Sequence, residues 1–454
     1  MTPITTRSVG AEIRRELPVT LKIAGPVVLA EIGWMAMGVI DTVMVGRLGA
    51  EAIGGVAIGN ILFNTIGLLS FGLILGMDTL ISQAFGAGKI RDCNHTLRQG
   101  LWLGIFVAPL LLVLMLLAAP TLSLWGVEPA VAVLAESYTE TIAWSVFPLV
   151  FYFAFRRYLQ STNIVRPVMF TLLTANLVNA FGNWLLIFGH WGFPAYGVRG
   201  AAMATVVGRV YMAVVLLAVL AMKERGESTG LFHFEWPDWL RIRTLLHLGL
   251  PAAGHIFVEI AVFATATALA GKFTAVALAA HEVALNNASM TFMVPLGISS
   301  AAAVRVGQEI GRGDRRAASI AGWTAILLGV GFMAISGLTM LAIPRLILGI
   351  YTPDVRVIET GVPLLFAAAA FQLFDGTQVV STGSLRGLGD TRTPFYANIT
   401  GYWVLGLPIG MFLCFRMGWE VLGLWIGLSI GLMIVAVVLL TRWVWASRVP
   451  SEAR

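Results

Sequence analysis

The segment LWLGIFVAPLLLVLMLLAA, from Leu101 to Ala119, decides the fold class of this chain. It carries no charge and is long enough to cross the hydrocarbon core of a bilayer, which takes roughly 20 apolar residues in a helix. Its apolar residues do not alternate with polar ones, as they would in a transmembrane β-strand. A spanning segment must pair its backbone polar groups internally. The segment therefore predicts a transmembrane α-helix.

Similar segments recur along the whole chain, and the composition agrees with a protein that lies mostly in lipid. Of the 454 residues, 58% are hydrophobic and only 12% are charged, whereas a soluble protein carries about 25% charged residues. We therefore predict an all-α, polytopic membrane protein with twelve transmembrane helices. The expected spans are residues 18–45, 53–80, 97–119, 131–157, 165–188, 197–222, 244–270, 275–303, 319–342, 357–384, 393–415 and 421–446.

The distribution of Lys and Arg predicts the orientation of these spans. Basic residues are frequent in the N-terminal segment and in alternate loops, and they are sparse in the other loops. Arg156 and Arg157 are counted among the basic residues of these alternate loops. By the positive-inside rule both termini are cytoplasmic, which requires an even number of spans and agrees with twelve. The basic residues form no single patch that would bind nucleic acid, despite a net charge of +6. We expect a multi-pass protein of the plasma membrane, most simply a bacterial inner membrane.

The second half of the chain repeats the first. LKIAGPVVLAEIG from Leu21 resembles LHLGLPAAGHIFV from Leu246, and QAFGAG from Gln83 resembles QEIGRG from Gln308. Both offsets are 225 residues, since 246 minus 21 equals 308 minus 83. Two halves of six spans have the same orientation, so a pseudo-twofold axis along the membrane normal relates them, as in parallel-repeat transporters. We predict two six-helix bundles, residues 1–222 and 244–454, joined by a cytoplasmic linker at 223–243.

Ionisable side chains inside the predicted spans are the first candidates for function, because a charge near the centre of a span costs about 2.5 kcal/mol or more. Glu259 lies in HIFVEIAVF, Asp375 in FQLFDGTQVV and Asp41 in IDTVMVGRLG. Burial favours the neutral form of a carboxyl group, so such a group can exchange a proton near neutral pH. Its oxygens also suit a hard cation such as Na⁺. We predict that Glu259 and Asp375 bind a coupling ion; a structural hydrogen-bonded pair is the alternative.

Two further acids have a local alternative to ion binding. Asp41 is expected to take part in ion coupling, but it could instead pair with Arg47 at the membrane interface. Glu282 is a fourth candidate for coupling-ion binding, and the adjacent His281 could satisfy it locally. The sequence leaves both choices open.

Uncharged polar residues lie near these acids in the sequence. Asn176, Asn179 and Asn183 are spaced three and four apart, so they share one face of a helix. They predict either interhelical hydrogen bonds or a proton network that reaches Asp41. We expect the proton network or the substrate cleft to comprise Asn176, Asn179, Asn183, Phe371, Gln372 and Gln378.

Several motifs together resemble the multidrug and toxic compound extrusion family, and in particular its NorM-like branch. They are IDTVMVGRLG from Ile40, DTLISQAFGAG from Asp78, AAHEVALN from Ala279, VRVGQEIGRGD from Val304 and LRGLGDTRTP from Leu385. The resemblance implies two six-helix bundles and the exchange of Na⁺ or H⁺ for cationic or amphiphilic compounds. It also implies that Asp41 matches the family's first-helix aspartate and that Glu259 and Asp375 match its acidic pair in the second bundle.

The chain departs from the family pattern at two positions. Asn183 stands where some relatives have a second acid, so a proton relay in the first bundle would depend mainly on Asp41. Phe371 stands where some Na⁺-linked members have a tyrosine, which removes a possible oxygen ligand. The choice between Na⁺ and H⁺ therefore stays open.

The functional expectation is an antiporter that exports organic cations or amphiphilic drugs by rocking of its two lobes. Its partners would be these small molecules and membrane lipid; we expect a monomer with no cofactor beyond the coupling ion. The alternative is a flippase of lipid-linked precursors, which would need a cationic cavity for pyrophosphate, whereas the candidate cavity here is acidic. An intramembrane enzyme is not expected, because the sequence has no HExxH motif.

Overall fold

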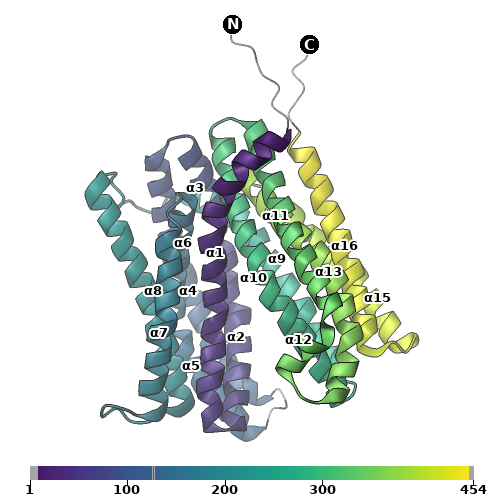
Figure 1. The fold of residues 1–454 in the computed structure, drawn as a ribbon. Coiled ribbons are helices and arrows are strands. Elements are labelled where there is room, and N and C mark those ends of the chain that lie inside the picture. The colour runs from purple at the N-terminus through teal and green to yellow at the C-terminus, as the bar shows by residue number, and fades with distance from the viewer. Residues whose placement is uncertain (1–8, 125, 127, 449–454) are drawn as a thin grey trace. The chain divides into compact units, whose positions relative to one another are not determined.

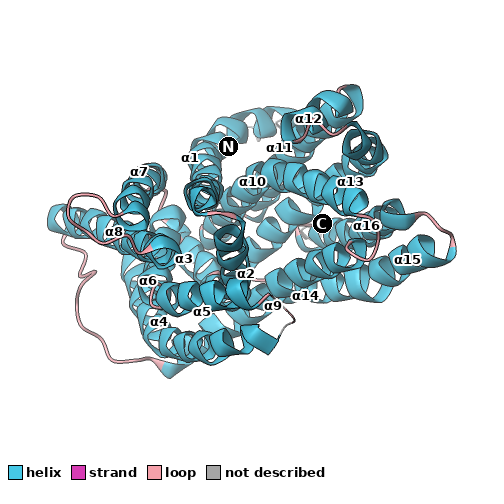
Figure 2. Cartoon of the chain, turned by 90° about the horizontal axis from the view of Figure 1, so that it is seen from below, coloured by secondary structure: helices cyan, strands magenta, loops and turns pink. Residues whose placement is uncertain are grey.

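The computed structural model describes residues 9–124, 126 and 128–448. The regular elements of these residues are all helices, and short loops join most of them (Figures 1 and 2). Eleven helices in the described ranges are long and apolar enough to cross a membrane. The prediction of an all-α, polytopic membrane protein is therefore confirmed.

The first half of the chain contains eight α-helices and two short 3₁₀ turns. Several spans are bent or divided, so that more than one helix makes up a predicted span. The elements are α1 (Val9–Val45), η1 (Gly46–Leu48), α2 (Ala50–Ile74), α3 (Gly76–Gly86), α4 (Ile90–Ala118), η2 (Ala119–Leu124), α5 (Pro129–Ala143), α6 (Val146–Ser161), α7 (Arg166–Phe188) and α8 (Gly197–Glu227).

The second half contains eight more α-helices. Its eleventh predicted span is built from short α-helices that alternate with π-helical turns. The elements are α9 (Trp239–Ala270), α10 (Ala275–Gly311), α11 (Arg315–Ala342), α12 (Pro344–Tyr351), α13 (Val355–Leu388), α14 (Arg392–Asn398), the π-helix η3 (Ile399–Gly406), α15 (Leu407–Met411), the π-helix η4 (Phe412–Arg416) and α16 (Glu420–Ala446).

The predicted span at 131–157 is two helices rather than one. Helices α5 and α6 have 15 and 16 residues and are separated at Trp144 and Ser145. Each is shorter than the roughly 20 residues that cross hydrocarbon. The Ser145 hydroxyl donates a hydrogen bond to the Ile142 carbonyl at 2.5 Å, which satisfies a backbone group at the break. This pair accounts for the difference between twelve predicted spans and eleven long helices.

The chain packs into two compact units. The N-terminal unit is Leu29–Ala253, and the C-terminal unit combines Met1–Val28 with Gly254–Arg454. The division falls inside α1 and α9. Within the C-terminal unit, Arg305 of α10 binds Glu16 of α1 through two contacts of 2.7 and 2.9 Å. These bonds connect the first part of α1 to the C-terminal unit.

Close helix packing in the C-terminal unit depends on glycine. A Cβ atom added at Gly427 of α16 would lie 2.2 Å from the Gly410 Cα in α15, and one at Gly431 would lie 2.5 Å from the Gly401 carbonyl oxygen. Small residues let helix backbones approach closely inside a membrane, where water does not drive association. This approach holds the π-helical eleventh span against α16.

Candidate ion-binding site

The centre of α13 carries a buried polar face. Gln372, Asp375 and Gln378 are spaced three residues apart, so they lie near one another on the helix, and all three are buried. Gln372 donates to the Thr291 hydroxyl of α10 at 2.5 Å. Asp375 makes no hydrogen bond or ion pair within the described part of the chain. It is therefore a buried carboxyl group without a compensating protein donor.

Glu259 of α9 contributes a second, partly buried carboxyl group to the C-terminal unit. Its Oε2 lies 3.5 Å from Nε2 of His255, one turn earlier on the same helix. The same His255 nitrogen lies 3.2 Å from the Gln378 amide nitrogen, which connects α9 to α13. Glu259 is near enough to Asp375 for the two carboxyl groups to repel each other when both are ionised. The structure therefore brings the two predicted acids into one cluster.

Tyr402 of the π-helix η3 belongs to this cluster and was not predicted. Its ring packs edge-on against Phe263, which packs in turn against Phe371, with centroid distances of 6.0 Å in both pairs. The fully buried Tyr402 hydroxyl has no hydrogen-bond partner among the described residues, and it lies within electrostatic range of Glu259 and Asp375. A hydroxyl oxygen is therefore present even though position 371 is phenylalanine.

The donor set of the cluster suits a hard cation or a proton. The structure as described contains no group of three or more His, Cys, Asp and Glu side chains placed to hold a metal ion. However, buried oxygens of Tyr402, Gln372 and Gln378 lack partners in the described residues. Together with the two carboxyl groups they offer oxygen ligands of the kind that hard cations prefer. These residues fit Na⁺, and the carboxyl groups alone fit H⁺.

Glu282 of α10 is not bound by its neighbour His281. Both ring nitrogens of His281 are engaged elsewhere, with the Thr267 hydroxyl at 2.9 Å and the Trp425 indole N–H at 3.1 Å. Glu282 is half-buried and makes no hydrogen bond or ion pair with any residue that the structure describes. The alternative in which His281 satisfies Glu282 is therefore wrong, and its role as an ion ligand stays a prediction.

Asp41 of α1 forms the centre of a separate polar cluster in the N-terminal unit. The Asn183 amide donates to its Oδ1 at 2.6 Å, and the Thr205 hydroxyl donates to its Oδ2 at 3.0 Å. Asn183 also donates to the Asn179 carbonyl oxygen at 3.3 Å. Arg47 is exposed and makes no ion pair in the described ranges. Asp41 is thus held by α7 and α8 rather than by Arg47.

The asparagine face of α7 divides into two parts. Asn176 donates to the carbonyl oxygens of Gly33 at 2.9 Å and Leu172 at 2.8 Å, so it joins α7 to α1. Asn179 and Asn183 form the hydrogen-bonded path to Asp41. The alternative of interhelical hydrogen bonds is therefore confirmed for Asn176, and the proton network through Asn179 and Asn183 stays a prediction.

Arg209 is a buried cation one turn after Thr205 on α8. Its guanidinium donates to the Ser145 hydroxyl at the break between α5 and α6 and lies over the Phe63 ring, 4.2 Å from the centroid. Asp41 is within electrostatic range of Arg209. The N-terminal unit therefore carries an internal positive charge beside its acid. In the C-terminal unit, Arg386 lies within electrostatic range of His255.

Two buried ion pairs of the N-terminal unit were missed. The prediction that Arg156 and Arg157 lie in a loop is wrong, because both are inside α6 and buried. Arg156 pairs with Glu31 of α1, and Arg157 pairs with Asp78 of α3 at 3.3 Å. A buried charge needs a partner, and Glu31 within the apolar run after Pro26 was the available signal.

The comparisons with known proteins agree with this architecture. A model of the MatE family matches residues 26–185 and 251–412 of the chain. This chain belongs to the MatE family. The two matches begin 225 residues apart, since 251 minus 26 is 225, which is the offset of the internal repeat. Family membership places this MatE-family chain among membrane transporters rather than enzymes.

Named relatives resemble this MatE-family chain along nearly its whole length. It is 38% identical over 444 residues to a "Probable multidrug resistance protein NorM" of Mesorhizobium japonicum, covering 96% of this chain and 95% of the relative. It is 37% identical to the protein of the same name from Brucella suis, covering 94% and 93%. The crystal structure of the eukaryotic MATE transporter AtDTX14 superimposes with a TM-score of 0.87 at 22% identity, covering 96% and 98%.

Proposed function

We propose that this chain is a secondary active antiporter that exports organic cations or amphiphilic drugs in exchange for Na⁺ or H⁺. Its NorM-named relatives are called multidrug resistance proteins, which supports the substrate class. The observation that carries the ion-coupling part is the pair of carboxyl groups, the buried Asp375 and the partly buried Glu259, whose cluster contains unpartnered oxygens. We place the chain in the bacterial inner membrane, with both termini cytoplasmic.

The charge of the C-terminal cluster provides the driving step. Two ionised carboxylates in a buried site repel each other, and at an effective dielectric constant of 20 a pair 4 Å apart interacts by about 4 kcal/mol. Binding of one H⁺ or Na⁺ removes one unit of negative charge and most of this repulsion. The ion can then shift the equilibrium between two conformations, provided that it binds one of them more tightly. Drug and ion would compete through this shared equilibrium.

The two units have different electrostatics, and this difference divides their roles. In the N-terminal unit Asp41 receives two hydrogen bonds, and Arg209 lies within electrostatic range. These groups hold the Asp41 side chain in place within the N-terminal unit. In the C-terminal unit, Asp375 receives no protein donor in the described residues. The C-terminal cluster is therefore the site at which a bound cation gains the most favourable electrostatic energy. Asp41 serves as a second protonation site.

The experiment is dye efflux from proteoliposomes under an imposed ion gradient. Na⁺ jumps at constant pH and pH jumps at constant Na⁺ identify the coupling ion. Glu259→Gln and Asp375→Asn keep the size of each side chain and remove its charge, and we expect the double variant to lose gradient-driven efflux. Glu51→Gln, at an exposed position in the first turn of α2, removes a carboxylate outside the cluster and is the control variant. Efflux that survives in the double variant would refute ion coupling at this cluster.

A further inference from the structure

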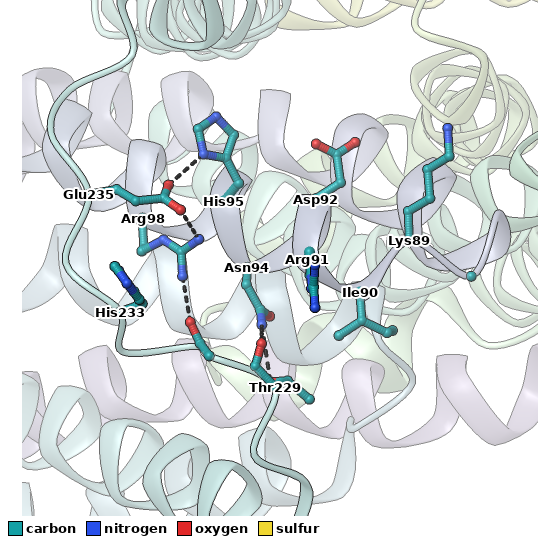
Figure 3. Close-up of a pocket in the computed structure, with 12 residues that line it drawn as sticks. Lys89, Ile90, Arg91, Asp92, Asn94, His95, Arg98, Thr229, His233 and Glu235 are labelled. Carbon is teal, nitrogen blue, oxygen red and sulfur yellow. Dashed lines mark hydrogen bonds and ion pairs between the residues drawn. The ribbon is translucent and has the colours of Figure 1, made fainter.

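The connection between α8 and α9 is bound along one polar face of α4. From Thr229 to Asp238 it runs past this helix without helical structure, with a turn at Leu231 and Phe232, beside a cavity of about 830 Å³ (Figure 3). Nearly every polar side chain on this face of α4 holds the connection. The contacts are Asn94 to the Thr229 hydroxyl (3.0 Å), Arg98 to the Gly230 carbonyl (2.7 Å), Gln99 to the Trp236 carbonyl (3.2 Å) and the Asp238 N–H (2.8 Å), and Trp102 to the Glu235 carbonyl (2.9 Å).

His95 is the centre of this attachment. Its Nδ1 lies 2.6 Å from the Glu235 carboxylate, which Arg98 also binds at 2.5 Å (Figure 3). Its Nε2 lies 3.1 Å from the Asp238 carboxylate. Burial works to raise the pKa of Glu235, but the hydrogen bonds from His95 and Arg98 outweigh it and lower this pKa. The backbone N–H of Arg241 is the largest cause of the lowered pKa of Asp238. The side of the connection that faces α4 is therefore charged and fixed.

The opposite side of the connection is aromatic and exposed. We call Phe232, Phe234, Trp236, Trp239 and Leu240 the aromatic face; their exposed fractions range from 54% to 77%. The first three are spaced two residues apart along the chain. An exposed apolar patch of this size marks a surface that another phase or molecule covers. The polar attachment to α4 orients it outward.

The aromatic face continues the lipid-facing surface of α4. Phe106 of α4 stacks on Trp239 with a centroid distance of 5.5 Å, and on Trp102 at 6.1 Å. Trp102 also meets Phe234 edge-on at 6.3 Å. Beyond Phe106 the apolar residues Leu110, Val113 and Leu117 of the same span are exposed. The patch therefore joins a surface that faces hydrocarbon in any transmembrane placement of α4.

The residues of the aromatic face have the chemistry of a membrane interface. Tryptophan and other aromatic side chains concentrate at the boundary between lipid headgroups and acyl chains. Arg243 is exposed beside the face, where it can meet phosphate groups, whereas Arg241 is paired with Asp92 of α4 at 2.5 Å. We propose that residues 232–240 form a membrane-interface anchor that inserts its aromatic face into the phospholipid headgroup–acyl boundary beside α4. The polar contacts of His95 and Arg98 hold this anchor to the N-terminal unit.

Site-directed spin labelling tests the anchor in the full chain. Cys93 and Cys414 are free and buried, so Cys93→Ala and Cys414→Ala provide a background for single cysteines at 234, 236 and 239. Glu227→Cys, at the exposed end of α8, is the matched control. For each label, the measured quantity is the ratio of its collision rate with oxygen to its collision rate with a water-soluble nickel complex. In vesicles of phosphatidylethanolamine and phosphatidylglycerol, we expect this ratio to be several-fold higher for the three labels than for the label at 227. Equal ratios at all four positions would overturn the proposal.

A second measurement leaves the cysteines unchanged. In vesicles of brominated phosphatidylcholine, bromine quenches tryptophans at the level of the acyl chains. We expect wild-type protein to lose more fluorescence to bromine than Trp236→Phe, because residue 236 contributes to the quenched fraction. An identical quenched intensity in the two proteins would place Trp236 in water and refute insertion of the aromatic face.

Discussion

Replacement of Tyr402 by phenylalanine isolates one oxygen of the candidate ion site. The ring is fully buried against Phe263, and its hydroxyl has no hydrogen-bond partner among the described residues. Tyr402→Phe keeps the ring and its packing, because only the hydroxyl is removed. The change therefore separates the contribution of this oxygen from the packing of the π-helix that carries it.

The size of the expected effect depends on whether an ion is bound. Leaving a buried hydroxyl unpaired costs about 1–3 kcal/mol, so Tyr402→Phe should match or exceed wild type in thermal stability without Na⁺. A contact to a charged group contributes about 1.5–3 kcal/mol. Because 1.4 kcal/mol is a tenfold change in affinity, half-maximal transport should need roughly 10- to 150-fold more Na⁺. If H⁺ is the coupling ion, the shift appears in the pH profile instead.

The assay is dye efflux from proteoliposomes, first against Na⁺ concentration at one pH and then against pH at one Na⁺ concentration. Tyr158→Phe is the matched control, because Tyr158 is also buried but its hydroxyl donates to Asn94 at 2.6 Å. It should lose about 0.5–1.5 kcal/mol of stability and keep the wild-type ion dependence. Unchanged ion activation in Tyr402→Phe, with a lower melting temperature, would show that the hydroxyl is structural.

Three further predictions concern the frame around the site. Glu31→Ala leaves the buried Arg156 without its partner and should lower the free energy of unfolding by about 3–5 kcal/mol. Thermal unfolding in detergent measures this loss, and a loss below about 1 kcal/mol would contradict a buried pair. Gly427→Ala places a Cβ 2.2 Å from the backbone of α15 and should destabilise by about 1–3 kcal/mol in the same assay, whereas unchanged stability would contradict the close approach. Burial works to raise the pKa of Asp390, but the hydrogen bond from Arg442 outweighs it and lowers this pKa. As the pH falls, the unfolded chain therefore protonates Asp390 before the folded chain does. Wild type should be more stable than Asp390→Asn above about pH 4 and should lose this advantage as the pH falls further. A difference in stability that persists at about pH 2 would contradict the ion pair.

The fold could be predicted from the sequence because a helix that crosses the hydrocarbon core of a bilayer must be long and apolar. Apolar segments and the 225-residue repeat were sufficient to predict a duplicated helical membrane protein. The break at Trp144 and Ser145 was not predicted, because neither residue interrupts the apolar pattern. The grouping of α1 with the second half was also missed, since it depends on ion pairs such as Arg305 with Glu16, which are distant in sequence.

The acids of the site were predictable, whereas their surroundings were not. Glu259 and Asp375 stand out because a charge in a span is costly. Tyr402 and His255 are ordinary residues in an apolar sequence, and only the packing of α9 and η3 with α13 brings them near the acids. The π-helical geometry that positions Tyr402 has no sequence pattern as clear as helical periodicity.

The central claim is that a cation at Glu259 and Asp375 drives export, and gradient-driven dye efflux in proteoliposomes tests it most directly. We predict that an inward Na⁺ or H⁺ gradient accelerates efflux by the wild-type chain and has no effect on the Glu259→Gln, Asp375→Asn double variant, at equal amounts of folded protein. Acceleration of equal size in both proteins would contradict the claim.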